Sequence, residues 1–231
     1  MGVRSDSDVV GRDPCGGPAP VDLSVCVACG DWFDQPHVAE DAAVLICRAC
    51  GHRQPFRRLP LVALTGPSGA GKSTVGRLLV RALADVAVVL EQDVLWTAGL
   101  RDPCDDFGQF RVAWLRMAAM IHQSGRPVVL VGTVVPAQLE QRAERVFIGP
   151  IHYLGLVCRS DVLRARLVNR PAWRGWTPSR IAETLAFNDW LQHAASSLDP
   201  PVELIDTTDQ PVTETAAAVA AWVRQRIAAA D

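Results

Sequence analysis

Short apolar runs alternate with amphipathic segments along most of this chain. Five runs are rich in Val, Leu and Ile and lie at residues 61–65, 87–90, 127–132, 152–157 and 202–205. Strands buried on both faces of a parallel sheet have this continuous apolar character. Segments with helical periodicity separate and follow the runs, near residues 73–84, 108–124, 136–144, 160–169, 178–195 and 212–228. The alternation predicts an α/β fold, a parallel five-stranded sheet with helices on both faces, and it places the last helix at the sheet edge.

The first 57 residues do not follow this pattern. Residues 1–21 mix Gly, Pro, Ser and Asp with few periodic apolar positions, so we expect a disordered leader that cannot offset the entropy of ordering. Residues 22–57 contain four cysteines in two pairs and are predicted to form a small separate module. The α/β domain is therefore predicted to span residues 58–231.

The four cysteines form two Cys-x-x-Cys pairs, each followed by glycine. They are Cys26, Cys29, Cys47 and Cys50. Two such turns present four thiolates tetrahedrally to zinc, and a site closed by four thiolates is structural rather than catalytic. A redox pair is the alternative, but redox chemistry needs one Cys-x-x-Cys rather than two in a short module. The spacing predicts a zinc ribbon whose metal supplies folding energy to a segment too small for its own core.

Composition narrows the location and the partners of the protein. The 231 residues are 49% hydrophobic and 21% charged, with a net charge of −2. No apolar stretch reaches membrane-spanning length and the N-terminus has no hydrophobic signal core, so we expect a cytoplasmic protein without a membrane partner. Near-balanced charge disfavours a large nucleic-acid footprint. Arg53, Arg57 and Arg58 form a local basic cluster, which a solvated linker explains equally well. The sequence leaves the oligomeric state open.

A glycine-rich segment joins the first apolar run to the first helical segment. It reads Gly-Pro-Ser-Gly-Ala-Gly-Lys-Ser-Thr over residues 66–74. Its glycines let successive backbone N–H groups turn towards a phosphate, and the following helix points its positive dipole end there. It predicts a nucleoside triphosphate site, with Lys72 on the β- and γ-phosphates and the Ser73 hydroxyl on Mg²⁺. The expected nucleotide-binding residues are Gly66, Ser68, Gly69, Ala70, Gly71, Lys72, Ser73 and Thr74.

Acidic residues follow the second apolar run, at a strand end that faces the ligand crevice of an open parallel sheet. Asp93 is the candidate that orients or deprotonates an acceptor hydroxyl, and the alternative is that it caps the next helix. Glu91 is expected to assist through magnesium-bound water. Trp96 is a candidate stacking surface for a planar acceptor, with core or lid packing as the alternative. Further candidate acceptor contacts are Asp105, Asp106 and Arg111.

Arginines are concentrated between residues 164 and 178. Arg170 and Arg174 flank Pro171, which ends a helix, and we expect them to form a lid over the phosphates. Such side chains stabilise the charge that spreads over the equatorial oxygens of a transferring phosphoryl group. Arg164 and Arg166 lie on the preceding helix. Solvated helix arginines are the alternative reading of this group.

The glycine-rich loop, the segment 91–96 and the arginine-rich lid together resemble the small-molecule branch of P-loop kinases, which includes nucleoside, shikimate, gluconate and chloramphenicol kinases. More narrowly, the chain resembles bacterial proteins labelled AAA-family ATPase or nucleoside kinase in which a cysteine module precedes the loop. The resemblance covers about residues 59–229 and implies ATP and Mg²⁺ as cofactors. It implies that Asp93 contacts the acceptor hydroxyl and that Arg170 and Arg174 engage the phosphates.

One departure concerns the third apolar run, which ends at Gly132 and Thr133 without the aspartate that holds magnesium in motor-type NTPases. Kinases tolerate this absence because the loop hydroxyl, the phosphates and water can hold the ion. A kinase mechanism is therefore favoured over a motor-type mechanism.

These observations predict an ATP-dependent kinase that transfers the γ-phosphate to a hydroxyl of a small molecule, with a nucleoside as the favoured acceptor. An antibiotic or sugar kinase is the main alternative. An RNA or DNA 5′-end kinase, or a nucleic-acid-linked ATPase that uses the zinc ribbon, is disfavoured by the slightly acidic net charge. A nucleotide sensor without turnover is disfavoured by Asp93 and the lid arginines.

Overall fold

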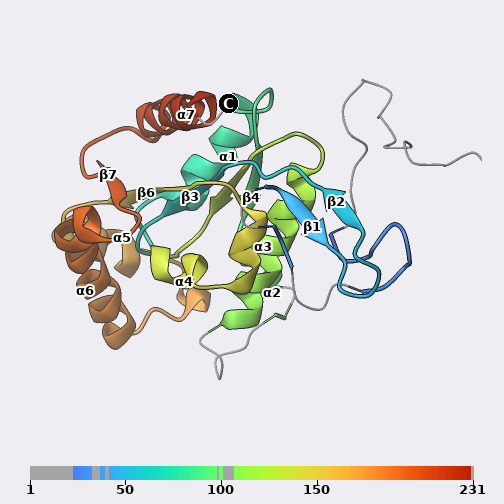
Figure 1. Cartoon of the computed structure of the whole chain (residues 1–231). Coiled ribbons are helices and arrows are strands. Elements are labelled where there is room, and N and C mark those ends of the chain that lie inside the picture. The colour runs from blue at the N-terminus through green and yellow to red at the C-terminus, as the bar shows by residue number, and fades with distance from the viewer. Residues whose placement is uncertain (1–22, 33–36, 40–41, 98, 101–106, 230–231) are drawn as a thin grey trace, which may run out of the picture. The chain divides into compact units, whose positions relative to one another are not determined.

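A computed structural model describes residues 23–32, 37–39, 42–97, 99–100 and 107–229 (Figure 1). The chain divides between Arg57 and Arg58 into two compact units. The leader expected at residues 1–21 lies outside the described residues. None of the described helices is long and apolar enough to cross a membrane.

The smaller unit is built on a two-stranded antiparallel sheet. Strands β1 (Val44–Ile46) and β2 (Arg53–Pro55) pair with Leu45 opposite Gln54. One tight turn precedes β1 and ends at Gly30, and a second lies between β1 and β2 and ends at Gly51. Both glycines are in the left-handed region, with φ 76° and 73°. A side chain is disfavoured in this conformation, so glycine after each cysteine pair is a local requirement of the fold.

The larger unit contains a five-stranded parallel sheet. Its strands are β3 (Leu61–Thr65), β4 (Val88–Glu91), β5 (Val128–Val131), β6 (Ile151–Val157) and β7 (Val202–Asp206). Their spatial order is β4-β5-β3-β6-β7. The predicted parallel five-stranded sheet is confirmed, with each strand beginning and ending within one residue of its apolar run.

Helices cover both faces of this sheet. Helices α1 (Lys72–Ala82) and α7 (Val212–Ala228) share one buried cluster with inward residues of three strands, among them Val62, Val129 and Leu154. Helix α7 was expected at the sheet edge; it packs beside α1 on this face and reaches edge strand β7 through the bond from Trp222 to Glu203. The Ala-rich side of α7 allows this close approach to the sheet.

The remaining helices lie along the chain between the strands. They are α2 (Asp93–Thr97), α3 (Gly108–His122), α4 (Pro136–Glu140), α5 (Ser160–Val168) and α6 (Pro178–Ala194), with 3₁₀ turns η2 (Ala143–Phe147), η3 (Ala172–Arg174) and η4 (Ala195–Ser197). The single helix expected near residues 136–144 is wrong, because α4 ends at Glu140 and η2 begins three residues later.

The parallel arrangement brings the carboxyl ends of all five strands to one edge of the sheet. The glycine-rich loop follows β3, Glu91 is the last residue of β4, and Gly132 follows β5. Ligands of open α/β sheets bind outside this edge, near the point where the strand order reverses. The fold therefore gathers the candidate residues from separate parts of the sequence.

Candidate active site

The loop over residues 66–71 owes its shape to three glycines with positive φ. Gly66 has φ 128°, and a Cβ there would lie 2.2 Å from the carbonyl oxygen of Leu156. Gly69 and Gly71 have φ 94° and 101°, and Gly71 is the N-cap of α1. Only glycine adopts these conformations without strain. The backbone consequently curls around the N-terminus of α1, as an anion-binding loop requires.

Lys72 begins α1 and folds back over this loop. Its Nζ donates to the carbonyl oxygens of Gly66 at 2.7 Å and of Pro67 at 3.0 Å. Desolvation of the Nζ lowers the pKa of Lys72 to about 8, although the negative charges of Glu91 and Asp93 act to raise it. The residue as a whole is only half-buried, because the cavity opens above it. At neutral pH the side chain keeps its proton and its charge.

The two acidic residues after β4 lie in the same cavity as Lys72. Burial raises the pKa of Glu91, and a hydrogen bond from the Ser73 hydroxyl acts in the opposite direction. Asp93 is exposed and is the first residue of α2, so its charge also suits the positive end of that short helix. The hydroxyl of Ser73 and the two carboxylates form a set of hard oxygen ligands beside the loop, the type that Mg²⁺ prefers.

The end of β5 is tied to the loop by hydroxyl groups. Thr133 donates from Oγ1 to the carbonyl oxygen of Gly66 at 3.0 Å, and the backbone N–H of Val134 donates to Oγ1 of Thr65 at 3.0 Å. Thr133 thus supports the loop backbone.

Arginines from the segment after α5 line the same cavity. Arg170 lies over the ring of Trp176, 5.1 Å from its centroid, and Arg174 lies 4.9 Å from the ring of Trp173. Desolvation by burial lowers the pKa of Arg170, and the neighbouring positive charges of Arg174 and Arg180 lower it further. The predicted pair is therefore assembled at the cavity, in a positively charged cluster.

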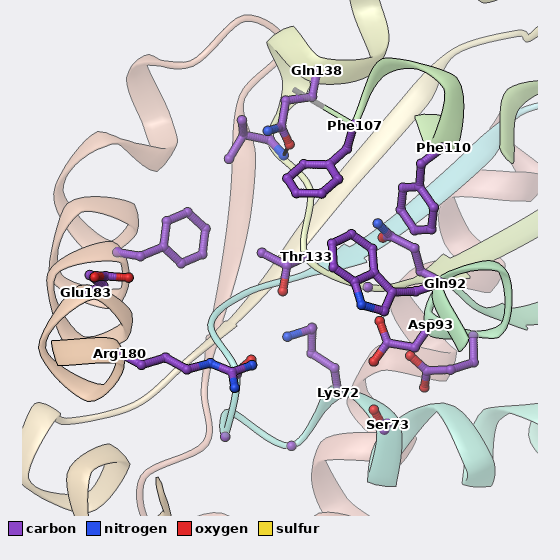
Figure 2. Close-up of a pocket in the computed structure, with 18 of the residues that line it drawn as sticks. Lys72, Ser73, Gln92, Asp93, Phe107, Phe110, Thr133, Gln138, Arg180 and Glu183 are labelled. Atoms are coloured by element: carbon purple, nitrogen blue, oxygen red, sulfur yellow. Dashed lines mark hydrogen bonds between the residues drawn. The ribbon is translucent and has the colours of Figure 1, made fainter. Parts of the chain in front are cut away.

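Sequence reasoning missed Arg180, which comes from the first turn of α6 and lies over Trp176 at 4.3 Å. Figure 2 shows it reaching from α6 towards the loop that carries Lys72. Its position four residues after Trp176, at a predicted helix start, was a signal that could have found it. Arg166 has another role, since its Nη2 donates to the carbonyl oxygen of Thr207 at 2.8 Å. Arg164 is exposed and does not line this cavity.

The cavity that holds these groups has a volume of about 1060 Å³. Trp96 lies against Phe107 with centroids 4.8 Å apart and the rings tilted by 42°, and it meets Phe110 edge-on at 5.7 Å. On the opposite side α6 contributes Phe187 and Trp190, whose rings stack at 5.7 Å. The backbone of Phe107 has φ 59°, a strained conformation for a non-glycine residue, of the sort that accumulates at functional sites.

Arg111 lines this cavity from α3 and is buried. Asp105 and Asp106, the other expected acceptor contacts, lie outside the described residues. Of the expected acceptor contacts, the structure therefore describes Trp96 and Arg111, and both line the cavity. Phe187 of α6 was not singled out from the sequence.

A second cavity, of about 340 Å³, lies against the other side of the loop. It shares Gly69, Gly71, Thr74 and Arg170 with the first, and its own lining comes from the loop, α1, α5, the segment after β7 and the start of α7. The polar residues that line only this second cavity are Arg166, Thr207, Gln210 and Thr215. The loop thus runs between two cavities, of which only the larger contains the carboxylates.

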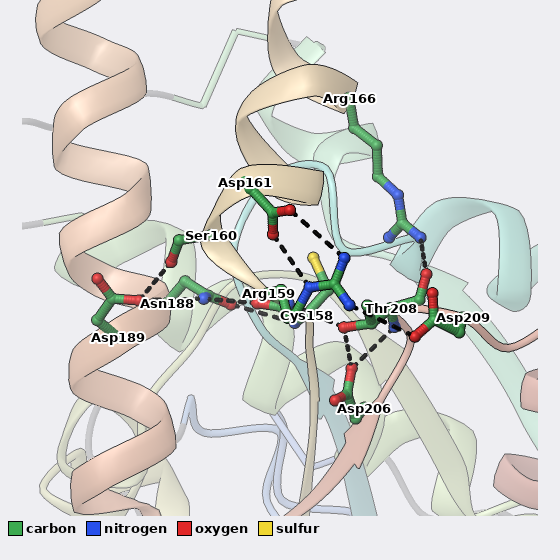
Figure 3. Close-up of polar contacts among 10 residues, drawn as sticks. All are labelled: Cys158, Arg159, Ser160, Asp161, Arg166, Asn188, Asp189, Asp206, Thr208 and Asp209. Atoms are coloured by element: carbon green, nitrogen blue, oxygen red, sulfur yellow. Dashed lines mark hydrogen bonds and ion pairs between the residues drawn. The ribbon is translucent and has the colours of Figure 1, made fainter.

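Helices α5 and α6 are fixed to the sheet by polar contacts (Figure 3). Asn188 of α6 donates to the carbonyl oxygen of Cys158 at 2.8 Å and accepts from its backbone N–H at 3.3 Å. Arg159 pairs with Asp161 at 3.2 Å, and its backbone N–H donates to Thr208 at 2.9 Å. These contacts hold the two helices that flank the arginine-bearing segment.

In the smaller unit the four cysteines converge. Their Sγ atoms all lie within 4.8 Å of one another, and the pairs Cys26–Cys50 and Cys29–Cys47 are 3.7 Å apart. Zinc held tetrahedrally at about 2.3 Å from each sulfur separates the sulfurs by about 3.8 Å. The cluster fits a small zinc ribbon.

Comparison with known proteins defines the family. The model of a family described as "AAA domain" matches residues 61–194, more than half of the chain. The chain therefore belongs to this P-loop family. It is 30% identical over 154 residues to a shikimate kinase of Pseudomonas syringae pv. tomato, across 64% of this chain and 87% of that protein.

Solved structures share the fold at lower identity. A kinase-like protein of Chloroflexus aurantiacus has a TM-score of 0.52 at 18% identity, over 76% of this chain and 99% of its own. A gluconokinase of Sinorhizobium meliloti has a TM-score of 0.51 at 20% identity, over 74% of this chain and 94% of its own. Within its family the chain is a small-molecule kinase, a phosphotransferase with a hydroxyl acceptor, and the family uses ATP and Mg²⁺.

Proposed function

We propose that this kinase phosphorylates a hydroxyl of a nucleoside, with the nucleoside in the cavity of about 1060 Å³. The observation that carries the proposal is the aromatic group formed by Trp96, Phe107 and Phe110 in the same cavity as Asp93. A planar base stacks on such rings, while its sugar reaches the carboxylate.

The phosphates of ATP are assigned to the loop between the two cavities. Its curled backbone, the N-terminus of α1 and the charge of Lys72 all favour an anion. Ser73, with Glu91 acting through water, would hold Mg²⁺, and their hydrogen bond already brings these oxygens together. The adenine is assigned to the smaller cavity, because the phosphate chain then points towards the carboxylates in the larger one.

Asp93 is assigned as the base that orients or deprotonates the acceptor hydroxyl. It is exposed to the cavity that also contains Lys72, so a hydroxyl bound beside it faces the γ-phosphate. Arg170 and Arg174, and also Arg180, would stabilise the transferring phosphoryl group as its charge spreads. The cation–π contacts of these arginines keep them at the cavity without neutralising their charge.

A sugar or a cyclic hydroxy acid is the second candidate acceptor. Two similar proteins are a shikimate kinase and a gluconokinase. The buried cation Arg111 in the acceptor cavity suits a carboxylate of this type of substrate. The experiment that tests the nucleoside proposal therefore has to include both classes of acceptor.

Acceptor-stimulated ADP release tests the proposal. The purified full chain would be supplied with Mg-ATP and, separately, with the common nucleosides, shikimate, gluconate, hexoses and aminoglycosides. A nucleoside is expected to accelerate ADP release and to appear as its monophosphate in the products. Phosphorylation of a sugar or hydroxy acid while every nucleoside fails would refute the nucleoside assignment. ATP hydrolysis stimulated only by RNA or DNA would refute small-molecule transfer altogether.

We also propose that the four cysteines bind one structural zinc ion. The sulfur spacings support it, and so do the left-handed glycines that follow each pair. A site with four protein ligands has no open position for catalysis. Metal analysis of protein purified without added zinc tests this, and a metal-free protein with disulfides within the pairs would favour redox chemistry instead.

A further inference from the structure

Gln92 lies between the two acidic residues at the end of β4 and lines the larger cavity. The residue is 9% exposed, and its Oε1 is buried without a hydrogen-bond partner among the described residues. A buried amide oxygen without a donor is costly, and native proteins seldom keep one. Because Gln92 as a residue lines the cavity, a ligand bound there is a source of the missing donor.

The position of Gln92 is fixed by its neighbours. Its backbone N–H donates to the carbonyl oxygen of Val131 at 2.8 Å, which continues the strand pairing beyond β4. Its side chain packs over Gly132, where an added Cβ would lie 1.9 Å from Oε1 and 2.4 Å from the Cβ of Gln92. The absence of a side chain at residue 132 therefore makes the room that the amide occupies. A restrained amide of this kind discriminates between ligands by hydrogen-bond geometry.

The surroundings of Gln92 indicate what supplies the donor. Figure 2 shows its amide on the side of the cavity where Phe107 and Phe110 lie, and Asp93 on the side of Lys72. A molecule whose hydroxyl is bound by Asp93 thus extends towards Gln92 and the rings. Aromatic faces with one buried amide at their edge suit a flat ring that carries an N–H group.

We propose that Gln92 is the residue that determines acceptor specificity, by hydrogen bonding the N–H edge of a heterocyclic base held against the aromatic group. This inference rests on the proposed nucleoside kinase activity. Oε1 accepts from an amino group or a ring N–H of the base, while the base stacks on Trp96, Phe107 or Phe110. A base without an N–H at that edge leaves Oε1 buried and unpaired, and binds more weakly for that reason.

The test uses matched acceptors and a variant of similar shape. The acceptor pairs are adenosine with purine riboside, cytidine with pyrimidinone riboside, and uridine with 3-methyluridine, which differ by the N–H at the ring edge. Gln92→Met keeps the length of the side chain and removes its hydrogen bonding. Gln225→Leu on α7, exposed and remote from both cavities, serves as the control. KM and kcat are measured for each acceptor and for ATP.

The wild-type protein is expected to favour the N–H-bearing member of its best pair by about 10- to 100-fold in kcat/KM, the scale of one buried hydrogen bond left unmade. Gln92→Met should abolish this preference through a raised acceptor KM, with the KM for ATP and kcat nearly unchanged. A residue with only a packing role would instead lower stability and preserve the preference.

The inference and the proposed function fail in different ways. If nucleosides are phosphorylated but Gln92→Met retains the preference, the role of Gln92 is overturned and the nucleoside kinase stands. If the wild-type protein does not distinguish the members of any pair, the role is overturned even when the variant fails to fold. If no nucleoside accelerates ADP release, the proposed function is overturned, and the base-reading role of Gln92 with it.

Discussion

Replacing Lys72 with methionine is expected to abolish phosphoryl transfer and to change the pH dependence of stability in the nucleotide-free protein. The fall in the pKa of Lys72 from 10.5 to about 8 corresponds to about 3 kcal/mol of unfavourable free energy in the folded state. This is an upper value, because the residue is partly exposed and solvent screens part of the cost.

The sign follows from the order of the two pKa values. Below a pH of about 8 both folded and unfolded chains carry the proton, so the folded state bears the whole cost. As pH rises from about 8 to 10.5 the folded state releases its proton first, and the wild-type protein gains stability. Lys72→Met lacks this gain, so its stability relative to wild type is expected to fall by about 2–3 kcal/mol between pH 7 and pH 10.5.

Urea unfolding of both proteins at several pH values measures the difference, with tryptophan fluorescence as the probe, since six of the seven tryptophans follow residue 57. Other titrating groups are shared by the two proteins and cancel. Parallel stability curves across this pH range would show that Nζ is not desolvated as the structure indicates. Turnover at the wild-type rate by a folded Lys72→Met protein would refute its role at the phosphates.

Four further predictions concern other parts of the molecule. Asp93→Asn should lower kcat by about a hundredfold or more and leave ATP affinity nearly intact, the usual scale for a positioned base; a loss confined to ATP binding would make Asp93 a nucleotide or metal ligand. Arg174→Ala should lower kcat more than it raises either KM, because its contact strengthens as charge develops in the transition state, whereas Arg164→Ala should match wild type. Trp96→Ala should raise the acceptor KM by about 10- to 100-fold and spare that of ATP, which steady-state kinetics would check. Cys26→Ser should lower the zinc content from about one ion per chain and loosen the smaller unit first, as amide hydrogen exchange would detect.

The strands and most helices were predictable because their signals are local. An unbroken run of Val and Leu such as 128–131 indicates a strand buried on both faces whatever its neighbours are. Helix α2 escaped prediction because it has five residues and none of them is buried, so it has no apolar periodicity. The break between α4 and η2 was missed for a similar reason, since both pieces fit one amphipathic pattern.

Candidate site residues can be found from the sequence where one segment carries the chemistry. They cannot be found where the fold brings separate segments together. Residues 66–74 specify their own loop through glycine positions. By contrast, Phe187 and Trp190 face the cavity only because α6 packs against α5 around a shared cluster that includes Leu163 and Leu185. Gln92 gave no signal in the sequence, because its burial depends on Gly132, forty residues further along the chain.

The anchoring of α5 and α6 limits how far the arginine segment can travel. Arg166 is bonded to the carbonyl oxygen of Thr207 near the end of α5, and Asn188 holds α6 to the backbone of Cys158. Only nine residues, 169–177, separate the two helices. A closing motion restricted to so short a span orders few backbone torsions, so its entropic cost is small and it needs no rotation of one domain against another. A lid motion confined to this segment is therefore expected to leave the overall dimensions of the larger unit the same with and without nucleotide.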